Sequence, residues 1–147
     1  MCIRDSVDAV SYDDNIAIYD ANAAVTVYGN TGADSVYVEQ THAQVDIFTH
    51  DGLDNIYIKA NEAVINIDSG IEIDYIKIGA SATVVGRVLN VSTDGTLDGI
   101  NASINLDGNT PSLVVGGDIL EITDTLNTLG RDITIVCLLY TSPSPRD

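Results

Sequence analysis

Four aspartates recur at an equal spacing of 20 residues: Asp14, Asp34, Asp54 and Asp74. If the chain stacks with this period, their carboxylates form a column with about 4.8 Å between neighbours. Two unit charges at that distance repel by about 1 kcal/mol in water and by more in a partly buried site. A hard cation such as Ca²⁺, with about six to eight oxygen ligands, relieves such repulsion. One interpretation of the spacing is therefore one or two weak calcium sites near Asp34 and Asp54, with Asp14, Asp74 and Asp51 as further candidate ligands.

The same aspartates also have a possible role that needs no metal. A carboxylate just before a strand can accept hydrogen bonds from backbone N–H groups in its own turn, as in an Asx turn. Such bonds would also offset the repulsion between neighbouring carboxylates. The sequence leaves both roles open.

Aliphatic residues follow each of these aspartates in a fixed order. They stand two and four positions after it: Ile16, Ile18, Val36, Val38, Ile56, Ile58, Ile76 and Ile78. Two further columns follow: Val25, Val45, Ile65 and Val85, then Val27, Ile47 and Ile67, which breaks at Arg87. Alternation of apolar and polar residues over short stretches is typical of strands with one buried face. Turn-forming residues separate the stretches.

A unit of 20 residues with two strands and two turns predicts the fold class. Each strand would pair in parallel with its equivalent one unit along the chain. The aliphatic columns would then become interior ladders, with Val36, Ile56 and Ile76 side by side. The sequence therefore predicts an all-β protein, a parallel β-solenoid of the β-helix or β-roll type, with about 20 residues per rung.

The repeat divides the chain into a regular and a looser part. Residues 7–86 hold the regular rungs. Over residues 87–136 the spacing is no longer uniform, and Pro111 requires a turn or a strand edge. We expect looser rungs of the same solenoid there, with longer loops. A small β-sandwich that begins near residue 88 is the alternative.

The two termini differ in character from the rest of the chain. "MCIRDS" at 1–6 and "CLLYT" at 137–141 can be encoded by inverted copies of one short DNA element. That element resembles the end of a transposase-type library adapter, and "SPSPRD" resembles its continuation. We therefore expect residues 1–6 and 137–147 to be artefacts of sequencing, and the rest to be an internal fragment of a longer protein.

The composition is strongly acidic, with a formal net charge of −16. This charge repels nucleic acids and anionic membrane surfaces and attracts cations. No apolar run approaches the ~18 residues that a membrane span requires. We therefore expect neither nucleic-acid binding nor membrane insertion.

The segment "GNTGADSVY" at 29–37 resembles the nonapeptide of haemolysin-type (RTX) repeats, with Asn30 in place of the second glycine. Weaker copies follow as "THDGLDNIY" at 49–57, "SGIEIDYIK" at 69–77 and "LVVGGDILE" at 113–121. The resemblance implies a degenerate repeat segment of a very large bacterial secreted or cell-surface protein. In that family the repeats form a parallel β-roll that binds calcium between consecutive turns. The resemblance therefore also implies an extracellular or cell-surface location.

These observations together predict a structural repeat segment, a rod or adhesive stalk, of a large extracellular protein. We expect no enzymatic activity in this segment. The alternative is part of a β-helical carbohydrate-active enzyme, a lyase or hydrolase, whose catalytic rungs lie outside it. Its only candidate residues are Asp46, Asp68, Lys59, Lys77 and Arg87, and nothing in the sequence pairs them.

Candidate partners follow from the outward-facing positions and from the ends of the solenoid. Tyr37 and Tyr57 share an outward column and form either an aromatic strip for carbohydrate or a simple cover for the sheet. His42 and His50 lie in different turns and are expected to be surface residues rather than metal ligands. Open strand edges favour edge-to-edge self-association of the isolated segment.

Overall fold

The computed structural model describes residues 5–8, 12–85, 88–108 and 118–126. All regular elements within these residues are β-strands. Sheet A contains, in spatial order, β1 (Asp5–Asp8), β3 (Val25–Tyr28), β5 (Val45–Phe48), β7 (Ile65–Asp68) and β11 (Ile104–Asp107). Sheet B contains β2 (Asn15–Ile18), β4 (Ser35–Val38), β6 (Asn55–Ile58), β8 (Tyr75–Ile78) and β12 (Ile119–Ile122).

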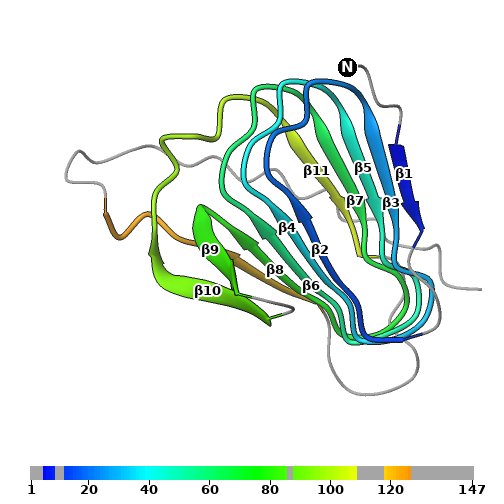
Figure 1. The fold of residues 1–147 in the computed structure, drawn as a ribbon. Coiled ribbons are helices and arrows are strands. Elements are labelled where there is room, and N and C mark those ends of the chain that lie inside the picture. The colour runs from blue at the N-terminus through cyan, green and yellow to red at the C-terminus, as the bar shows by residue number, and fades with distance from the viewer. Residues whose placement is uncertain (1–4, 9–11, 86–87, 109–117, 127–147) are drawn as a thin grey trace, which may run out of the picture.

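The chain alternates between the two sheets and coils around a common interior (Figure 1). Neighbouring strands of each sheet are parallel, and their register is one repeat unit: Val36 lies opposite Ile56, and Ile56 lies opposite Ile76. The predicted parallel β-solenoid with about 20 residues per rung is therefore confirmed. Short strands rich in Val and Ile suit this arrangement, because β-branched side chains pack well on a pleated surface.

The aliphatic columns face inward and form the core between the sheets. In the central rungs the side chains of Val36, Val38, Ile56 and Ile58 have no exposed surface. The core is made of many aliphatic side chains from every rung, so each rung depends on its neighbours for burial. The predicted interior ladders are confirmed.

The regular period ends at Gly79, where an antiparallel hairpin is inserted. It consists of β9 (Ala80–Val85) and β10 (Val88–Gly95). Val85 was expected to continue the column of Val45 and Ile65, and this prediction is wrong. Ile104 takes that place, because β11 pairs with β7 after 39 residues rather than 20.

The solenoid resumes beyond the hairpin. β11 extends sheet A, and β12 extends sheet B with Leu120 opposite Ile76. Both strands are parallel to their neighbours and keep the register of the earlier rungs. The alternative of a separate β-sandwich from residue 88 is therefore wrong.

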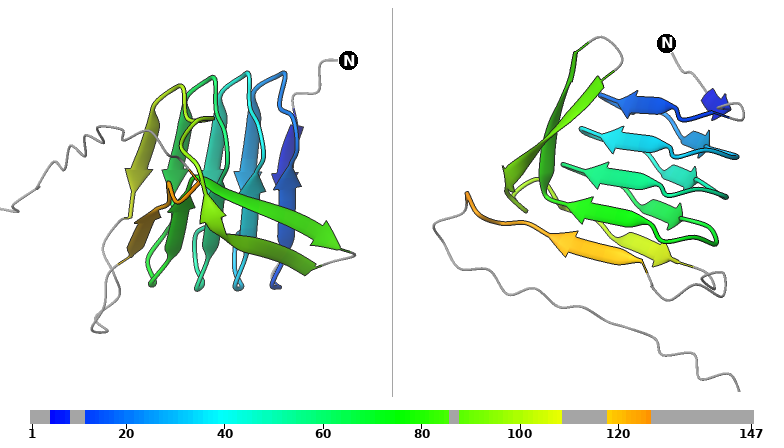
Figure 2. Two further views of the ribbon diagram at one scale, coloured as in Figure 1. Left: turned by 90° about the vertical axis from the view of Figure 1, so that its left-hand side faces the viewer. Right: turned by 90° about the horizontal axis from the view of Figure 1, so that it is seen from below.

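The hairpin lies across the outer side of sheet B, at a steep angle to its strands (Figure 2). Beneath it, Tyr37 is fully buried and Lys77 is 6% exposed, although both side chains point away from the core. Burial raises the pKa of Tyr37, and the backbone of Ala82 in β9 opposes part of this rise. Sheet B is thus covered on both sides near these residues.

Most of the predicted adapter segments lie outside the described residues: 1–4 and 137–147. Asp5 and Ser6, which belong to the first of them, form the beginning of β1 and pair with Val25 and Thr26. Arg87 and Pro111 also lie outside the described residues.

Candidate functional site

The aspartates that precede the strands of sheet B are joined by hydrogen bonds between rungs. The N–H of each donates to Oδ1 of the equivalent residue one rung further on. The N···O distances are 2.8 Å from Asp14 to Asp34, 2.8 Å from Asp34 to Asp54, 2.9 Å from Asp54 to Asp74 and 3.1 Å from Asp74 to Asp118. We call Asp14, Asp34, Asp54, Asp74 and Asp118 the aspartate ladder.

The ladder brings together four of the five residues predicted as calcium ligands. Its carboxylates do accept backbone hydrogen bonds, as the metal-free interpretation expects. The donor, however, is the aspartate of the preceding rung rather than an N–H of the same turn. Each carboxylate therefore ties two rungs together.

The three central aspartates of the ladder are buried. Asp34 and Asp74 have no exposed surface and Asp54 is 1% exposed. The Oδ2 atoms of all three have no hydrogen-bond partner among the described residues. Burial raises the pKa of Asp54 to about 6 and also raises the pKa of Asp34 and of Asp74. A buried carboxyl oxygen without a partner favours the neutral acid, because the charged form loses its hydration.

Small residues surround these Oδ2 atoms at the corner where sheet A leads into sheet B. The column contains Gly29, Thr49, Ser69 and Gly108. A Cβ atom at Gly29 would lie 2.4 Å from Asp34 Oδ2, and one at Gly108 would lie 2.0 Å from Asp118 Oδ2. The hydroxyls of Thr49 and Ser69 lower the pKa of Asp54 and of Asp74, against the larger effect of burial. The corner therefore has room for the carboxyl group and little else.

Asp51, the fifth predicted ligand, is exposed and is not part of the ladder. Its backbone forms an isolated bridge with Thr31. Within the described ranges, no group of three or more His, Cys, Asp or Glu side chains is arranged to hold a metal ion. Calcium binding remains a prediction.

The glycines of the RTX-like segments make the same corner tight. Gly70 has φ of 101°, and a Cβ atom there would lie 1.6 Å from the His50 carbonyl oxygen of the previous rung. Asn30 and His50, two rungs and one rung earlier in that column, also have positive φ, at 71° and 68°. The left-handed conformation favours glycine and tolerates Asn and His. At these positions the backbones of successive rungs can lie in direct contact.

The tyrosine column on the outer side of sheet B is largely closed. Tyr37 is buried under the hairpin, and Tyr57 packs edge-on against Tyr75 with ring centroids 6.2 Å apart. Lys77 forms an ion pair with Glu121 at 2.9 Å, and the Tyr75 hydroxyl donates to the same carboxylate. Among the described residues, the tyrosines of sheet B therefore form no continuous aromatic strip.

Glu121 links β12 to β8 and is itself perturbed by these contacts. The hydrogen bonds from Tyr75 and Lys77 lower the pKa of Glu121 to about 2, while burial and the nearby Glu121 raise the pKa of Tyr75 to about 12. The late strand is thus held to the regular rungs by polar contacts as well as by the sheet.

The described residues considered for catalysis do not converge. Asp46 and Asp68 lie on sheet A, whereas Lys77 lies on sheet B. Lys59, directly after β6, pairs with Glu39 at 2.9 Å, and this hydrogen bond raises the pKa of Lys59.

The outer side of sheet A carries two stripes of side chains. In one, Tyr28 and Phe48 stack with centroids 5.5 Å apart, and His50 stacks 6.3 Å from Phe48. In the other, amide hydrogen bonds join successive rungs: Asn66 donates to Asp46, and Asn105 donates to Asn66. Gln44 also donates to Asp46, within its own rung. Both stripes run along the solenoid and tie its rungs laterally.

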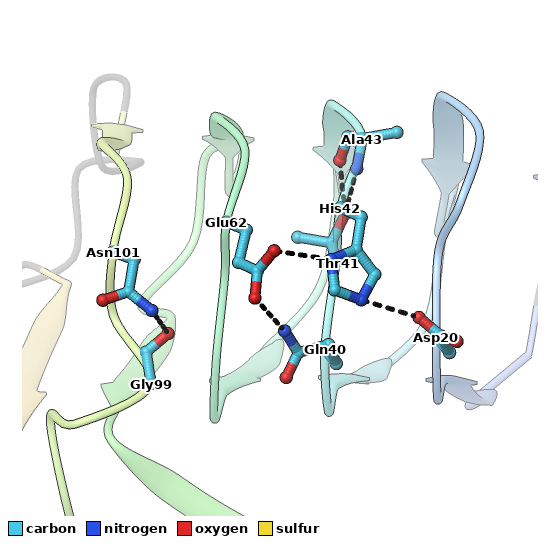
Figure 3. A network of polar contacts seen from close by, with 8 residues as sticks. All are labelled: Asp20, Gln40, Thr41, His42, Ala43, Glu62, Gly99 and Asn101. Carbon is cyan, nitrogen blue, oxygen red and sulfur yellow. Dashed lines mark hydrogen bonds and ion pairs between the residues drawn. The ribbon is translucent and has the colours of Figure 1, made fainter.

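A second polar network lies at the opposite corner, where sheet B leads into sheet A (Figure 3). His42 Nδ1 lies 2.7 Å from Glu62 Oε2, and Nε2 lies 3.4 Å from Asp20 Oδ1. The three residues come from consecutive rungs, and the His42 side chain is 40% exposed. The two carboxylates lie on opposite sides of the ring, so the group does not enclose one metal position.

Sequence reasoning missed Asp118 as a member of the ladder and missed the hairpin. The signal for Asp118 was present, because Asp118 precedes the alternating "ILEI" as the other ladder residues precede their strands. The constant period concealed it, since Asp118 follows Asp74 by 44 residues. The lateral contact of His42 with two carboxylates required the stacking of rungs to be known.

Comparison with family models, with curated proteins and with solved structures gave no match to this chain. Among the described residues no helix is long and apolar enough to cross a membrane. The functional argument therefore depends on the fold and the contacts described above.

Proposed function

We propose that this chain is a structural rod segment, without enzymatic activity, of a large secreted or cell-surface protein. The observation that carries the proposal is the set of contacts that repeats between consecutive rungs. Strand pairing, interior aliphatic columns, the aspartate ladder and the outer stripes of sheet A all join one rung to the next. Such a molecule resists extension along its axis, because each rung is held by its neighbours.

The acidic composition supports the extracellular part of this proposal through its effect on solubility and partners. A net charge of −16 keeps a repetitive β-protein soluble and repels nucleic acids. Both described lysines are already paired with glutamates, Lys59 with Glu39 and Lys77 with Glu121. The negative charge of the exposed carboxylates attracts cations in the medium, and weak calcium binding, as predicted from the sequence, is part of the proposal.

Force spectroscopy on the full chain, held at its two ends, tests the rod. We expect extension to proceed in steps of one rung, each releasing about 20 residues or roughly 70 Å of chain. If the whole folded region unfolds in one event at low force, the proposal is contradicted. The contacts between rungs would then not resist extension one rung at a time.

Calcium is tested in the same instrument and by calorimetry. We expect the unfolding force to rise when Ca²⁺ replaces EGTA and the rise to disappear in the double variant Asp34→Asn/Asp54→Asn. Asp46→Asn, on the outer side of sheet A, is the matched control and should keep the effect. Absence of both binding heat and a force change would remove calcium from the proposal and leave the rod.

A further inference from the structure

Two segments of the chain have the pattern of an N-glycosylation acceptor, an asparagine followed two residues later by serine or threonine. They are "NVS" at 90–92 and "NAS" at 101–103. The pattern is necessary and not sufficient, because the transferring enzyme must also reach the asparagine amide on the surface. The structure places the two segments in different surroundings.

The segment 101–103 is a short loop at the corner where sheet B leads into sheet A (Figure 3). It follows the bridge between Ile100 and Asn61 and ends directly before β11. Asn101 and Ser103 are exposed, whereas Ala102 between them is half-buried. The two side chains that the pattern requires therefore lie together on the solvent side of the loop.

The loop is held from its inner side by Asn61, which is fully buried. Asn61 Nδ2 donates to the Ala102 carbonyl at 3.0 Å, and the Asn101 N–H donates to the Asn61 carbonyl at 2.9 Å. The side-chain amide of Asn101 has a long contact, 3.5 Å from Nδ2 to the Gly99 carbonyl, where a good hydrogen bond is about 2.9 Å. The backbone therefore fixes the loop and leaves this amide accessible.

The exposure of Asn101 follows from its column at the corner. The N–H groups of His42, Glu62 and Asn101 each donate to a carbonyl of the preceding rung, so the three residues occupy equivalent positions. His42 lies between two rungs, with Asp20 and Glu62 on either side, and its side chain is still 40% exposed. A side chain in this column is therefore open to solvent even with rungs on both sides.

The other segment, 90–92, lies within a strand. Asn90 is exposed, but it belongs to β10 and pairs with Thr83 in β9. The hydroxyl of Ser92, which the pattern requires, accepts a hydrogen bond from the Asp94 N–H at 3.1 Å. An enzyme that draws this segment into its own cleft must first open the hairpin, and such local opening costs free energy.

We propose that Asn101 is the acceptor of an N-linked sugar, with a sugar nucleotide as the donor, and that Asn90 is not. In the transfer, Asn101 Nδ2 forms a bond to the anomeric carbon of the sugar while the bond from that carbon to the diphosphate breaks. The amide loses one proton, and the nucleoside diphosphate leaves. The sugar projects from the corner between the sheets and adds a bulky, solubilising group to the side of the rod. The inference goes beyond the rod proposal, which concerns contacts between rungs.

The test incubates the folded full chain with UDP-glucose and a soluble N-glycosyltransferase that accepts Asn-x-Ser segments. Mass spectrometry with peptide fragmentation locates each added hexose. We expect a hexose at Asn101 in the wild type and none there in Asn101→Gln or Ser103→Ala. Synthetic peptides of residues 86–94 and 97–105 give the intrinsic rates of the two segments. Relative to its peptide, Asn90 in the full chain should react at least about tenfold more slowly than Asn101, because its strand must open first.

A matched variant tests the corner itself. Asn22 is exposed in the same column and stands in "NAA" at 22–24, which lacks the serine. Ala24→Ser completes the pattern and should make Asn22 a second acceptor, while Asn22 in the wild type stays unmodified. Far-UV circular dichroism checks that each variant keeps its strands.

Three results would overturn the inference: no hexose at Asn101 of the folded chain, equal relative rates at Asn90 and Asn101, or no hexose at Asn22 in Ala24→Ser. The rod proposal is tested separately by the force measurement, so neither experiment decides the other.

Discussion

The rungs before Gly79 and the strands after it pack in the same way, although different lengths of chain separate their equivalent residues. From β2 to β8 the equivalent residues are 20 apart, whereas Ile65 and Ile104 are 39 apart and Ile76 and Leu120 are 44 apart. The spatial register is nevertheless the same. The contacts between rungs therefore define the fold. The 20-residue period of the sequence is seen only where no segment has been inserted between equivalent strands.

Shortening a core side chain in each region gives the largest expected contrast. Ile56→Ala should lower the free energy of unfolding by about 2–5 kcal/mol, because the fully buried side chain leaves a cavity. Leu120→Ala, in the same column but 42% exposed, should cost less than about 1 kcal/mol. Urea unfolding of monomeric protein at low concentration measures both. Equal losses would mean that the late strands are packed as tightly as the early ones.

Adding a methyl group at the tight corner should cause the next largest loss of stability. Gly70→Ala should destabilise the protein by more than about 2 kcal/mol, since φ is 101° and the new Cβ would overlap the His50 carbonyl. Gly99→Ala, in the later region, meets the Ala60 methyl at 2.6 Å and should cost less. Thermal unfolding of both variants ranks them. The reverse ranking would contradict the corner geometry.

Because of the buried aspartate ladder, the folded protein should be more stable at mildly acidic pH than at neutral pH. The pKa of Asp54 in the folded state, about 6, lies above the ordinary 3.8, and the pKa values of Asp34 and Asp74 are also raised. Between these values the folded protein binds more protons than the unfolded chain, so the free energy of unfolding falls as the pH rises. For Asp54 the loss between about pH 4 and pH 7 should be about 2 kcal/mol. Melting temperatures in EGTA measure it.

Two variants separate the ladder from the general charge of the protein. Asp54→Asn keeps an acceptor for the Asp34 N–H and should flatten the pH dependence. Asp51→Asn, at an exposed aspartate, should leave the dependence nearly unchanged. A melting temperature that rises from pH 4 to pH 7 in the wild type would contradict the assignment.

Deleting residues 80–95 tests whether the hairpin is dispensable to the register. We expect the solenoid to remain, with a loss of about 1–3 kcal/mol from the exposure of Tyr37 and its surroundings. Burial raises the pKa of Tyr37, and the deletion should return it toward 10.0. Ultraviolet titration of the deletion variant, with and without Tyr37→Phe, follows this change. Loss of the strand signal would show that the hairpin is needed for β11 and β12 to pair.

The smallest effect is expected at the exposed corner. His42→Ala removes the contacts with Asp20 and Glu62 and should change stability by less than about 1 kcal/mol. The change should shrink further in about 1 M salt, where exposed charges are screened. A loss that survives high salt would mean that His42 acts through packing instead.

The sequence was sufficient for the fold because its signal was repeated. Aliphatic residues in columns such as Ile16, Val36 and Ile56 predict both the strands and their parallel stacking. It was not sufficient for the hairpin, since "ASATVV" and the following residues alternate just as rung strands do. Which partner such a strand chooses depends on three-dimensional contacts that a period cannot express.

The candidate site was predicted in part, for a similar reason. The column of ladder aspartates followed from spacing, and their burial did not, because an aspartate before a strand is ordinarily exposed. The direction of the hydrogen bonds, from Asp34 to Asp54 rather than within one turn, needed the distance between rungs. Asp118 joined the ladder only when the insertion before it was recognised.

The one-way direction of the aspartate ladder has a consequence for how the molecule is assembled in time. The amide of Asp14 is satisfied by a carboxyl that arrives 20 residues later, and that of Asp34 by Asp54. A chain that emerges from its amino end therefore cannot complete any rung until its successor has appeared. During synthesis, each rung therefore completes its ladder hydrogen bond only after the next rung has been made.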